Sequence, residues 1–534
     1  MKTMISSIIL ASCLALPLAS CSDSDVAPEQ KDWSTTTYFY SADAAMQDTY
    51  YKPTVGYVGD PMPFFDPVAG DFKVLYLQDF RPNPEGTYHP IWGVSTKDAA
   101  HYTSLGELVA CGTKKSQDAA IGTGSTIYDE ASKLYYTFYT GNKYLPTGDE
   151  SAQAVMVATS LDFKTWTKDR TFLLKGQDFG YDKNDFRDPF VFKGDDGKFH
   201  MLISTKKGGK GSLAEFVSDD LKNWTDNGVF MTMMWDRFYE CPDLFKMGDY
   251  WYLVYSEIHH AVRRVQYFKG RTLDELKACT ANDAGIWPDA HEGFLDSRGL
   301  YAGKTASDGT NRYLWGWCPT RSGKDNTAVG ASPAEPEWGG NLVCYKLIQH
   351  EDGTLTLGQV DAVSEKYNQD VAVEVKESQN MTEADGTYTL AGNAELDAYM
   401  LMGRLGNHNK ISFTVTTSNE WDKFGISMVR GSDSKKYYTM VVNPENENNR
   451  KVNFEEQGVE GKGFIAGIDG YVFARPADNV YNITIYTDNS ICVMYINDVC
   501  SYTNRIYGIQ KNCWSIDSFN GANVKVSNLK ISQY

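Results

Sequence analysis

A short unit that recurs five times in the first two thirds of the chain constrains the fold most strongly. Each copy begins with an acidic or glycine-containing turn and continues into a strand that is dense in Tyr, Trp, Leu and Val. The copies occupy residues 66–80, 129–142, 194–206, 246–257 and 307–318, at intervals of about 50 to 65 residues. Each is typical of a β-hairpin whose second strand is buried on both faces. Four-stranded units repeated around an axis form a β-propeller, so five copies predict five blades.

A second shared piece, a β-hairpin that ends in an aromatic residue, follows three of these copies. It occupies residues 95–106, 159–169 and 218–228. Helical periodicity is nearly absent, and residues 271–279 are the best candidate for a short helix. The chain is therefore expected to be all-β.

The repeat stops after about residue 365, and the last third of the chain alternates apolar and polar residues in short segments. These segments are 410–418, 423–431, 436–443, 482–498 and 524–532, separated by Gly and Asn turns. Such period-2 alternation in short strands predicts a β-sandwich. We expect a five-bladed β-propeller over residues 46–360, followed by a C-terminal β-sandwich over residues 375–534.

The composition limits the classes of partner. The 534 residues carry a net charge of −18 and no basic cluster, which argues against nucleic acid as a partner. Aromatic residues make up 13% of the chain, and most are expected in the β-core, with some free to stack on sugar rings. Eight cysteines remain after Cys13 and Cys21, with no zinc-type spacing. We expect neither a metal site nor a cofactor, and buried free thiols are the simplest interpretation of these cysteines.

The N-terminus has the features of an export signal. Lys2 is followed by an apolar stretch over residues 4–18 that is too short to span a bilayer. Leu18-Ala19-Ser20-Cys21 then resembles the signal box of bacterial lipoproteins, in which the cysteine becomes the lipidated first residue. Residues 1–21 are accordingly predicted to be a signal peptide ending at lipidated Cys21, and residues 22–45 a polar tether. The expected location is the cell envelope of a Gram-negative bacterium, at the outer membrane or cell surface.

Three acidic motifs lie beside a proline at comparable places in the repeats. They are Gly59-Asp60-Pro61, Arg187-Asp188-Pro189 and Glu240-Cys241-Pro242, each at the start of an inner strand. In a propeller such positions converge on the axis, so Asp60, Asp188 and Glu240 are expected to line one central pocket. Glycoside hydrolysis needs one ionised carboxylate and one carboxyl group with a raised pKa, and a third acid can bind sugar hydroxyls. Arg187 is expected to keep Asp188 ionised.

These motifs and several neighbouring segments resemble glycoside hydrolase family 32, the fructan-cleaving enzymes that include invertases, inulinases and levanases. The segments that carry the resemblance are 74–80 (VLYLQDF), 87–98 (TYHPIWGVSTKD), 121–129 (IGTGSTIYD), 186–192 (FRDPFVF), 239–245 (YECPDLF), 295–305 (LDSRGLYAGKT) and 337–342 (EWGGNL). The resemblance implies a five-bladed propeller, a β-sandwich and a retaining fructosidase. It also implies that Asp60 is the nucleophile, Asp188 the transition-state stabiliser and Glu240 the acid/base. The substrate-binding residues that it implies are Gln78, Trp92, Ser125, Arg187, Asp296 and Trp338.

The chain departs from the family pattern at two places. Gly59 replaces an asparagine that contacts the sugar in the family, and Cys492 replaces an acidic residue in the tail. Two other functions therefore stay open. One is a related furanosidase acting on arabinan or xylan-type glycans, whose members generally invert. The other is a non-catalytic glycan-binding lipoprotein. Lys304 is interpreted equally as a substrate contact or a strand cap. Trp315 and Trp317 alternate on one strand, and core packing is expected for at least one of them, with a sugar platform as the alternative.

Overall fold

The fold is taken from a computed structural model. It describes residues 49–80, 89–233, 238–257, 264–279, 292–297, 299–321, 336–393, 395–430, 436–444, 451–455, 471–472 and 475–534. The predicted signal peptide, its Cys21 and the tether lie outside these ranges. None of the helices within them is long and apolar enough to cross a membrane.

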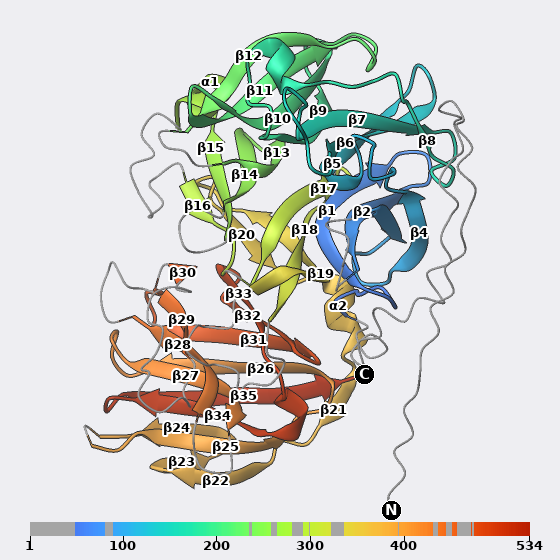
Figure 1. Cartoon of the computed structure of the whole chain (residues 1–534). Helices are drawn as coiled ribbons and strands as arrows, with labels where there is room; N and C mark the ends of the chain where they lie inside the picture. Colours follow the sequence, from blue (N-terminus) through green and yellow to red (C-terminus); the bar gives the residue numbers. More distant parts are fainter. Residues whose placement is uncertain are drawn as a thin grey trace, which may run out of the picture.

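The first part of the described chain is a β-propeller of five blades, each made of four antiparallel strands, as the repeat predicts (Figure 1). Blade 1 contains β1 (Tyr57–Asp66), β2 (Asp71–Asp79), β3 (Ile91–Thr96) and β4 (Thr103–Val109). Blade 2 contains β5 (Ala120–Asp129), β6 (Leu134–Asn142), β7 (Gln153–Ser160) and β8 (Thr167–Lys168). Blade 3 contains β9 (Phe186–Lys193), β10 (Phe199–Lys207), β11 (Lys210–Ser218) and β12 (Thr225–Thr232).

Blade 4 contains β13 (Glu240–Met247), β14 (Tyr250–Glu257), β15 (Arg264–Gly270) and β16 (Glu292–Phe294). Blade 5 contains β17 (Tyr301–Ser307), β18 (Arg312–Arg321), β19 (Pro336–Gln349) and β20 (Leu355–Gly358). The ring closes where β19 of blade 5 pairs with β1 of blade 1, at Gly340 and Val58. This pairing places the first and last blades in one continuous sheet.

The five repeated sequence units become the second strand of each blade together with the turn before it. Strands β2 and β6 are buried along nearly their whole length, which explains why these segments lack alternation and are dense in aromatic and branched residues. The predicted short helix is α1 (Leu273–Ala278), whose N-terminus is capped because Thr272 Oγ1 accepts a hydrogen bond from the backbone N–H of Glu275.

The second shared piece forms the turn between strands 3 and 4 of the first three blades. Asp98, Asp162 and Asp220 occupy the same position in these turns, and each carboxylate accepts hydrogen bonds from two backbone N–H groups just after it. The residue that follows each aspartate has a positive φ. Hydrogen bonds from backbone N–H groups lower the pKa of Asp162 to about 2 and that of Asp220 to about 2.

The propeller leads through α2 (Asp361–Lys366) into a sandwich of two antiparallel sheets. One sheet contains β21 (Gln369–Val371), β23 (Met381–Ala384), β24 (Thr387–Ala391), β26 (His408–Thr417), β31 (Val480–Asp488), β32 (Ile491–Ile496), β33 (Cys500–Arg505) and β35 (Asn523–Gln533). The other contains β22 (Val375–Gln379), β25 (Ala398–Arg404), β27 (Lys423–Arg430), β28 (Lys436–Asn443), β29 (Lys451–Glu455), β30 (Tyr471–Val472) and β34 (Cys513–Phe519). Two short 3₁₀ helices occupy Gly176–Phe179 and Ile509–Lys511.

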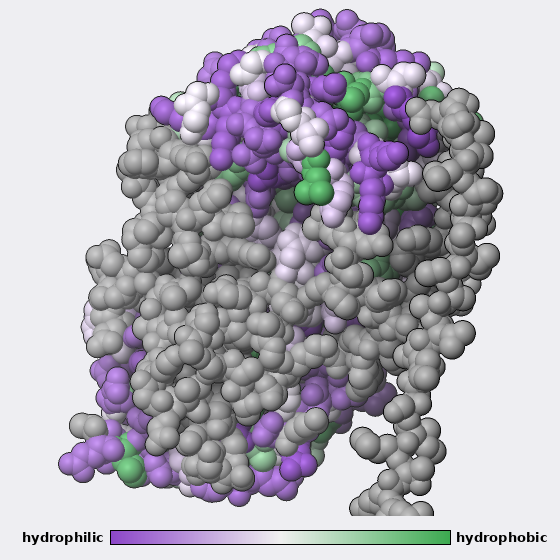
Figure 2. Space-filling model, viewed as in Figure 1, coloured by the Kyte–Doolittle hydropathy of each residue, from purple (hydrophilic) through white to green (hydrophobic). Residues whose placement is uncertain are grey.

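The sandwich is packed as its alternating sequence predicts. Residues of β26 are alternately buried and half-buried, and its inward side chains join one core with those of both sheets. Because β21 pairs with β35, the sandwich already begins at Gln369, earlier than the predicted start at residue 375. All eight cysteines beyond the predicted signal peptide are free thiols, and Cys492 lies fully buried in the sandwich core. Figure 2 shows a largely hydrophilic surface over the blades at the top of the view, consistent with the strongly acidic composition.

Candidate active site

The five innermost strands share a β-bulge at equivalent positions, and these bulges build the site. Asp60, Asp188, Cys241 and Ala302 have positive φ values of 26°, 58°, 52° and 52°, while β5 has its bulge at Thr123. Residues other than glycine rarely adopt this conformation, and bulges that redirect side chains concentrate near functional sites. The first three of these residues are each followed by proline, which has no N–H to lose from the strand ladder.

The positions of these bulges show which residues of the three acidic motifs are structurally equivalent. Cys241, not Glu240, is the structural equivalent of Asp60 and Asp188, and Glu240 precedes it as Arg187 precedes Asp188. Equivalent residues of neighbouring blades lie close to one another around the ring. The side chains of Glu240 and Arg187 therefore pair with each other.

Asp60 is held by hydrogen bonds from two neighbouring blades. Thr123 Oγ1 donates to one carboxylate oxygen at 2.6 Å, and the indole Nε1–H of Trp317 donates to the other at 3.0 Å. Burial raises the pKa of Asp60, the hydrogen bonds from Thr123 and Trp317 lower it, and the charge of Glu240 raises it. Two fixed donors thus favour the ionised form of a carboxylate whose pKa burial raises.

Asp188 is the most deeply buried of the three acids, with 4% of its surface exposed. Its carboxylate accepts a hydrogen bond of 2.9 Å from the backbone N–H of Cys241, and its own N–H donates to Thr140 Oγ1 at 2.9 Å. Burial raises the pKa of Asp188 to about 6, the charge of Arg187 lowers it, and Glu240 and Asp60 raise it. Arg187 therefore acts in the expected direction, favouring the ionised form of Asp188, although desolvation outweighs its charge.

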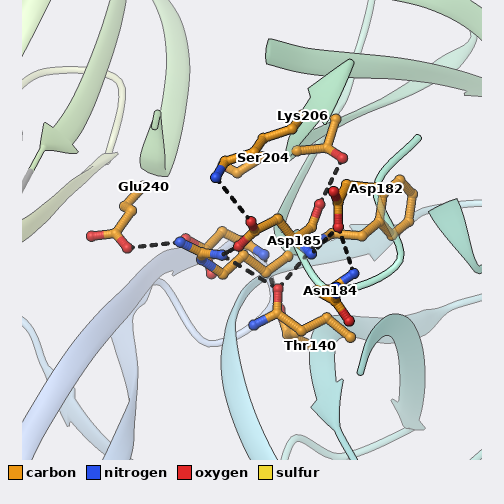
Figure 3. Close-up of polar contacts among 12 residues, drawn as sticks. Thr140, Asp182, Asn184, Asp185, Ser204, Lys206 and Glu240 are labelled. Atoms are coloured by element: carbon orange, nitrogen blue, oxygen red, sulfur yellow. Dashed lines mark hydrogen bonds and ion pairs between the residues drawn. The ribbon is translucent and has the colours of Figure 1, made fainter. Parts of the chain in front are cut away.

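Glu240 is fixed by one partner at each carboxylate oxygen. Arg187 Nη2 donates to Oε1 at 2.9 Å, and the hydroxyl of Tyr301 contacts Oε2. The other arm of the guanidinium donates to Asp185 Oδ1 at 2.7 Å. Figure 3 shows Glu240 on one side of this arrangement and Asp185 with Lys206 on the other. Arg187 therefore bridges two carboxylates and fixes the position of Glu240.

Two of the predicted substrate-binding residues, Ser125 and Gln78, form hydrogen bonds within the propeller domain. Ser125 accepts a hydrogen bond from the N–H of Val191 and donates to the carbonyl oxygen of Pro189, both at 2.9 Å. It thus links β5 to the bulge that carries Asp188. Gln78 is fully buried in β2, and its amide N–H donates to the carbonyl oxygen of Val55.

Trp92 and Trp338 are both half-buried, but their surroundings differ. Trp92 lies in β3, the third strand of blade 1, and its ring packs against Phe80 with centroids 6.0 Å apart. The ring of Trp338 lies 6.0 Å from that of Trp317 and stacks on His89 with centroids 4.2 Å apart. Trp338 is therefore the one of the two that adjoins the residues around Asp60.

Asp296 is not brought to the carboxylate cluster. It is completely buried, and its oxygens accept hydrogen bonds from the hydroxyls of Ser501 and Thr503 and from the backbone N–H of Thr503, at 2.7 to 3.0 Å. These partners belong to β33 of the sandwich. In this structure Asp296 therefore lies in the contact between the two domains, where the backbone N–H of Ser297 also donates to it at 2.6 Å, and its contact with substrate stays a prediction.

The departure at Gly59 has a steric cause. A Cβ atom at this position would lie 2.2 Å from the ring of Trp338, a distance that no side chain tolerates. The aromatic ring thus occupies the space next to Asp60 in which an asparagine side chain would have to begin. Glycine at 59 and tryptophan at 338 form one coupled feature of this site.

Sequence reasoning missed Thr123 and Tyr301 as site residues and left Trp317 and Lys304 undecided. Thr123 could have been found because it occupies, in the second blade, the place of the aspartates in blades 1 and 3. Lys304 contacts the neighbouring blade, where its buried ammonium donates to the carbonyl oxygen of Gly124 at 2.7 Å.

The chemistry of the site is that of carboxylates. Within the described residues, no group of three or more His, Cys, Asp or Glu side chains is placed to hold a metal ion. The three acids differ in their partners: Asp60 has neutral donors, Asp188 a backbone N–H, and Glu240 a guanidinium and a phenol. The three carboxyl groups thus lie in three different hydrogen-bonding environments, which is the arrangement that sites with two carboxylates in different roles use.

Comparison with known proteins assigns both parts of the chain to one family. Residues 50–360 match the description "Glycosyl hydrolases family 32 N-terminal domain", and residues 353–531 match "GH32, BT1760-like, C-terminal domain". An insoluble beta-fructofuranosidase isoenzyme of Arabidopsis thaliana is 30% identical over 310 residues, which cover 53% of this chain and 50% of the relative. The chain thus spans about half the length of the curated relatives it matches.

Solved structures agree in fold. A sucrose-6-phosphate hydrolase from Lactobacillus gasseri superimposes with a TM-score of 0.66 at 19% identity, covering 92% of this chain and 94% of the other. Fructan 1-exohydrolase IIa from Cichorium intybus gives a TM-score of 0.68 at 16% identity, covering 91% and 97%. At such identities the likeness shows the propeller-plus-sandwich fold alone. With the family matches over nearly the whole described chain, the protein belongs to glycosyl hydrolase family 32.

Proposed function

We propose that this protein is a retaining glycoside hydrolase that cleaves fructosyl linkages of fructans or sucrose-like oligosaccharides. The observation that carries the proposal is the arrangement around Asp60, a carboxylate fixed by Thr123 and Trp317 within the electrostatic reach of Glu240. Family membership and the beta-fructofuranosidase relative support the choice of a fructosyl substrate.

Asp60 serves as the nucleophile. One of its oxygens forms a bond to the anomeric carbon of the fructosyl unit while the bond from that carbon to the leaving oxygen breaks. The donors on both oxygens favour the ionised form of the carboxylate and fix its direction of attack. In the second half of the reaction, water attacks the same carbon and Asp60 leaves as a carboxylate.

Glu240 serves as acid and then as base. It gives its proton to the leaving oxygen in the first step and takes one from the attacking water in the second. The guanidinium of Arg187 can only donate, so Oε1 stays an acceptor, whereas the hydroxyl of Tyr301 can turn to accept from a proton on Oε2. Oε2 is therefore the oxygen that can carry the transferred proton.

Asp188 binds hydroxyl groups of the fructosyl unit. Its interaction strengthens as positive charge develops on the ring, provided that the carboxylate is ionised. Because its pKa is raised to about 6, the same group becomes a poorer stabiliser under mildly acidic conditions. The half-buried ring of Trp338 beside Gly59 presents an apolar surface where an amide would stand.

A substrate panel tests the proposal. Sucrose, inulin, levan and arabinan are incubated with protein lacking residues 1–21, and Asp60→Asn serves as the inactive control. Release of fructose that is lost in the control supports the proposal, and the polymer that is cut reports the linkage. Release of arabinose alone would indicate the related furanosidase instead. Binding of a glycan without release of any sugar would indicate a glycan-binding protein.

The stereochemical course is tested by adding methanol to the reaction. A retaining enzyme transfers the fructosyl unit from Asp60 to methanol and gives the methyl β-fructoside, because the covalent intermediate accepts either nucleophile. An inverting enzyme, which activates one water for direct attack, would give only free fructose.

Export and lipid anchoring are part of the proposal, with support from the sequence alone. The segment Leu18-Ala19-Ser20-Cys21 and the polar residues after it favour a lipoprotein of the outer membrane or cell surface. Labelling of the protein by radioactive palmitate in cells, abolished in Cys21→Ser, is the expected result. Unlabelled protein released into the periplasm would instead indicate an ordinary secretory signal.

A further inference from the structure

The sandwich contacts the propeller through β33, the edge strand of one of its sheets (Figure 1). The carboxylate of Asp296, just after blade 4, accepts three hydrogen bonds from Ser501 and Thr503 of this strand. Ser297 adds a bond of 2.6 Å to the carbonyl oxygen of Thr503. The approach is close, since a Cβ at Gly299 would lie 1.9 Å from that carbonyl oxygen. The two domains are therefore held in one fixed register.

Arg505, at the end of β33, extends this contact into blade 5. Its Nε donates to the carbonyl oxygen of Pro319 at 3.0 Å, and its Nη2 donates to the carbonyl oxygen of Cys318 at 2.8 Å and to Asn341 Oδ1 at 2.6 Å. Its Nη1 donates to Ser490 within the sandwich at 2.9 Å. Arg505 is almost completely buried, with 4% of its surface exposed. A charged fork with several hydrogen bonds in a buried interface fixes backbone position strongly.

The backbone that Arg505 holds leads directly to the proposed nucleophile. Cys318 follows Trp317, whose buried indole donates the 3.0 Å hydrogen bond to Asp60. A second connection runs through the sheet, since Pro319 pairs with Gly340 and Gly340 pairs with Val58, two residues before Asp60. Both connections cross the junction where blade 5 closes on blade 1.

We propose that Arg505 is a positioning residue for the nucleophile, through which the sandwich completes the active site without touching the substrate. By fixing the carbonyl groups of Cys318 and Pro319, it fixes the indole of Trp317 and hence the carboxylate of Asp60. Small misplacements of a reacting group cost large factors in rate. The inference rests on the proposed role of Asp60 and assigns a catalytic purpose to the second domain.

The test compares two buried arginines of the sandwich. Arg505→Met removes the guanidinium at the interface, and Arg430→Met removes one inside the sandwich. Arg430 is 7% exposed, bonds to Asp517 at 3.1 Å and Ser515 at 3.2 Å, and stacks on Tyr399. Both variants lose a buried ion or hydrogen-bond partner, so both are expected to lower the melting temperature. Only Arg505→Met is expected to affect chemistry.

For Arg505→Met we expect a loss of about tenfold or more in kcat on the best fructan, with little change in KM. The acid limb of its pH–rate profile should move to higher pH, because a weaker indole hydrogen bond leaves Asp60 harder to ionise. Arg430→Met should keep the parent's kcat and pH profile at temperatures where it is folded. Arg505→Lys keeps the charge but not the fork, and should lie between Arg505→Met and the parent.

A spectroscopic readout makes the test independent of turnover. With nitrogen-labelled tryptophan, the indole resonance of Trp317, assigned by its loss in Trp317→Phe, reports the ionisation of Asp60. In Arg505→Met and Arg505→Lys this titration should move to higher pH, and in Arg430→Met it should not. An unchanged titration and kcat in folded Arg505 variants would overturn the inference. A parent protein that releases no fructose would overturn the proposed function instead, while the titration still decides the role of Arg505.

Discussion

Replacing Asp188 by asparagine should abolish activity and at the same time stabilise the protein at neutral pH. Asparagine retains an oxygen for the N–H of Cys241 but removes a charge that burial disfavours. The native pKa of about 6 exceeds the ordinary value of 3.8 for an unfolded chain. Wild-type stability from this group is therefore fully present below pH 3.8 or so and is lost as the pH rises through about 6.

The size of the effect follows from the shift. At pH 8 the ionised carboxylate costs the native state about 3 kcal/mol, and at pH 4.5 about 1 kcal/mol. Asp188→Asn should accordingly unfold at a higher temperature than the parent at pH 8, with the advantage shrinking towards pH 4.5. The assay is thermal unfolding followed by circular dichroism across this pH range.

Asp162→Asn is the matched control. The pKa of Asp162 is lowered to about 2 by backbone N–H groups, so its stabilising effect is present above the unfolded pKa and is lost only as the pH falls towards 2. This variant should be less stable than the parent by an amount that hardly changes between pH 4.5 and 8. If Asp188→Asn showed the same flat difference, or were destabilised at pH 8, the argument that desolvation dominates at Asp188 would be refuted.

Three further changes follow from the same contacts. Thr123→Val removes the 2.6 Å hydrogen bond to Asp60, so it should lower kcat about tenfold and shift the acid limb of the pH–rate profile to higher pH. Thr123→Ser keeps the hydroxyl and should keep the parent's kcat and pH profile. An unaltered pH profile in the valine variant would contradict the role of this hydrogen bond. Gly59→Ala should lose activity and stability because its Cβ meets Trp338 at 2.2 Å, and adding Trp338→Ala to the same chain should restore the melting temperature. A melting temperature that the second substitution does not restore would contradict the steric explanation. Lys304→Met removes a buried cation that interacts with Asp60, so the pH of half-maximal activity should rise. An unchanged pH of half-maximal activity would show that the lysine only holds neighbouring blades in contact.

The blade count and the three acids could be predicted because the repeat places equivalent residues at equivalent positions. Asp60 and Asp188 occupy the same bulge in different blades, so periodicity alone brings them to the axis. The one-residue offset of Glu240 could not be read in the same way, because the bulge residue of blade 4 is Cys241 and a bulge has no fixed sequence mark. The pairing of Glu240 with Arg187 follows from that offset and was seen only in the structure.

Asp296 shows where motif reasoning ends. Its place in a family-like segment suggested a substrate contact, but its partners, Ser501 and Thr503, lie more than two hundred residues later. No local sequence pattern predicts a hydrogen bond between two domains, because that bond depends on how the folded domains pack against each other. The same holds for Arg505 and its hold on Cys318.

Local sequence patterns were enough to predict the class of fold, the number of blades and the three carboxylates that are proposed to be catalytic. These follow from local rules: the period of the repeat, the burial pattern of short strands and the position of Asp-Pro motifs before them. The groups that form hydrogen bonds with these acids could be identified only in the tertiary structure. Thr123, Trp317 and Tyr301 reach Asp60 and Glu240 from other blades, and the sandwich fixes one of these side chains from a second domain. Proton affinity depends on burial and on neighbours in space, which only the closed ring brings together.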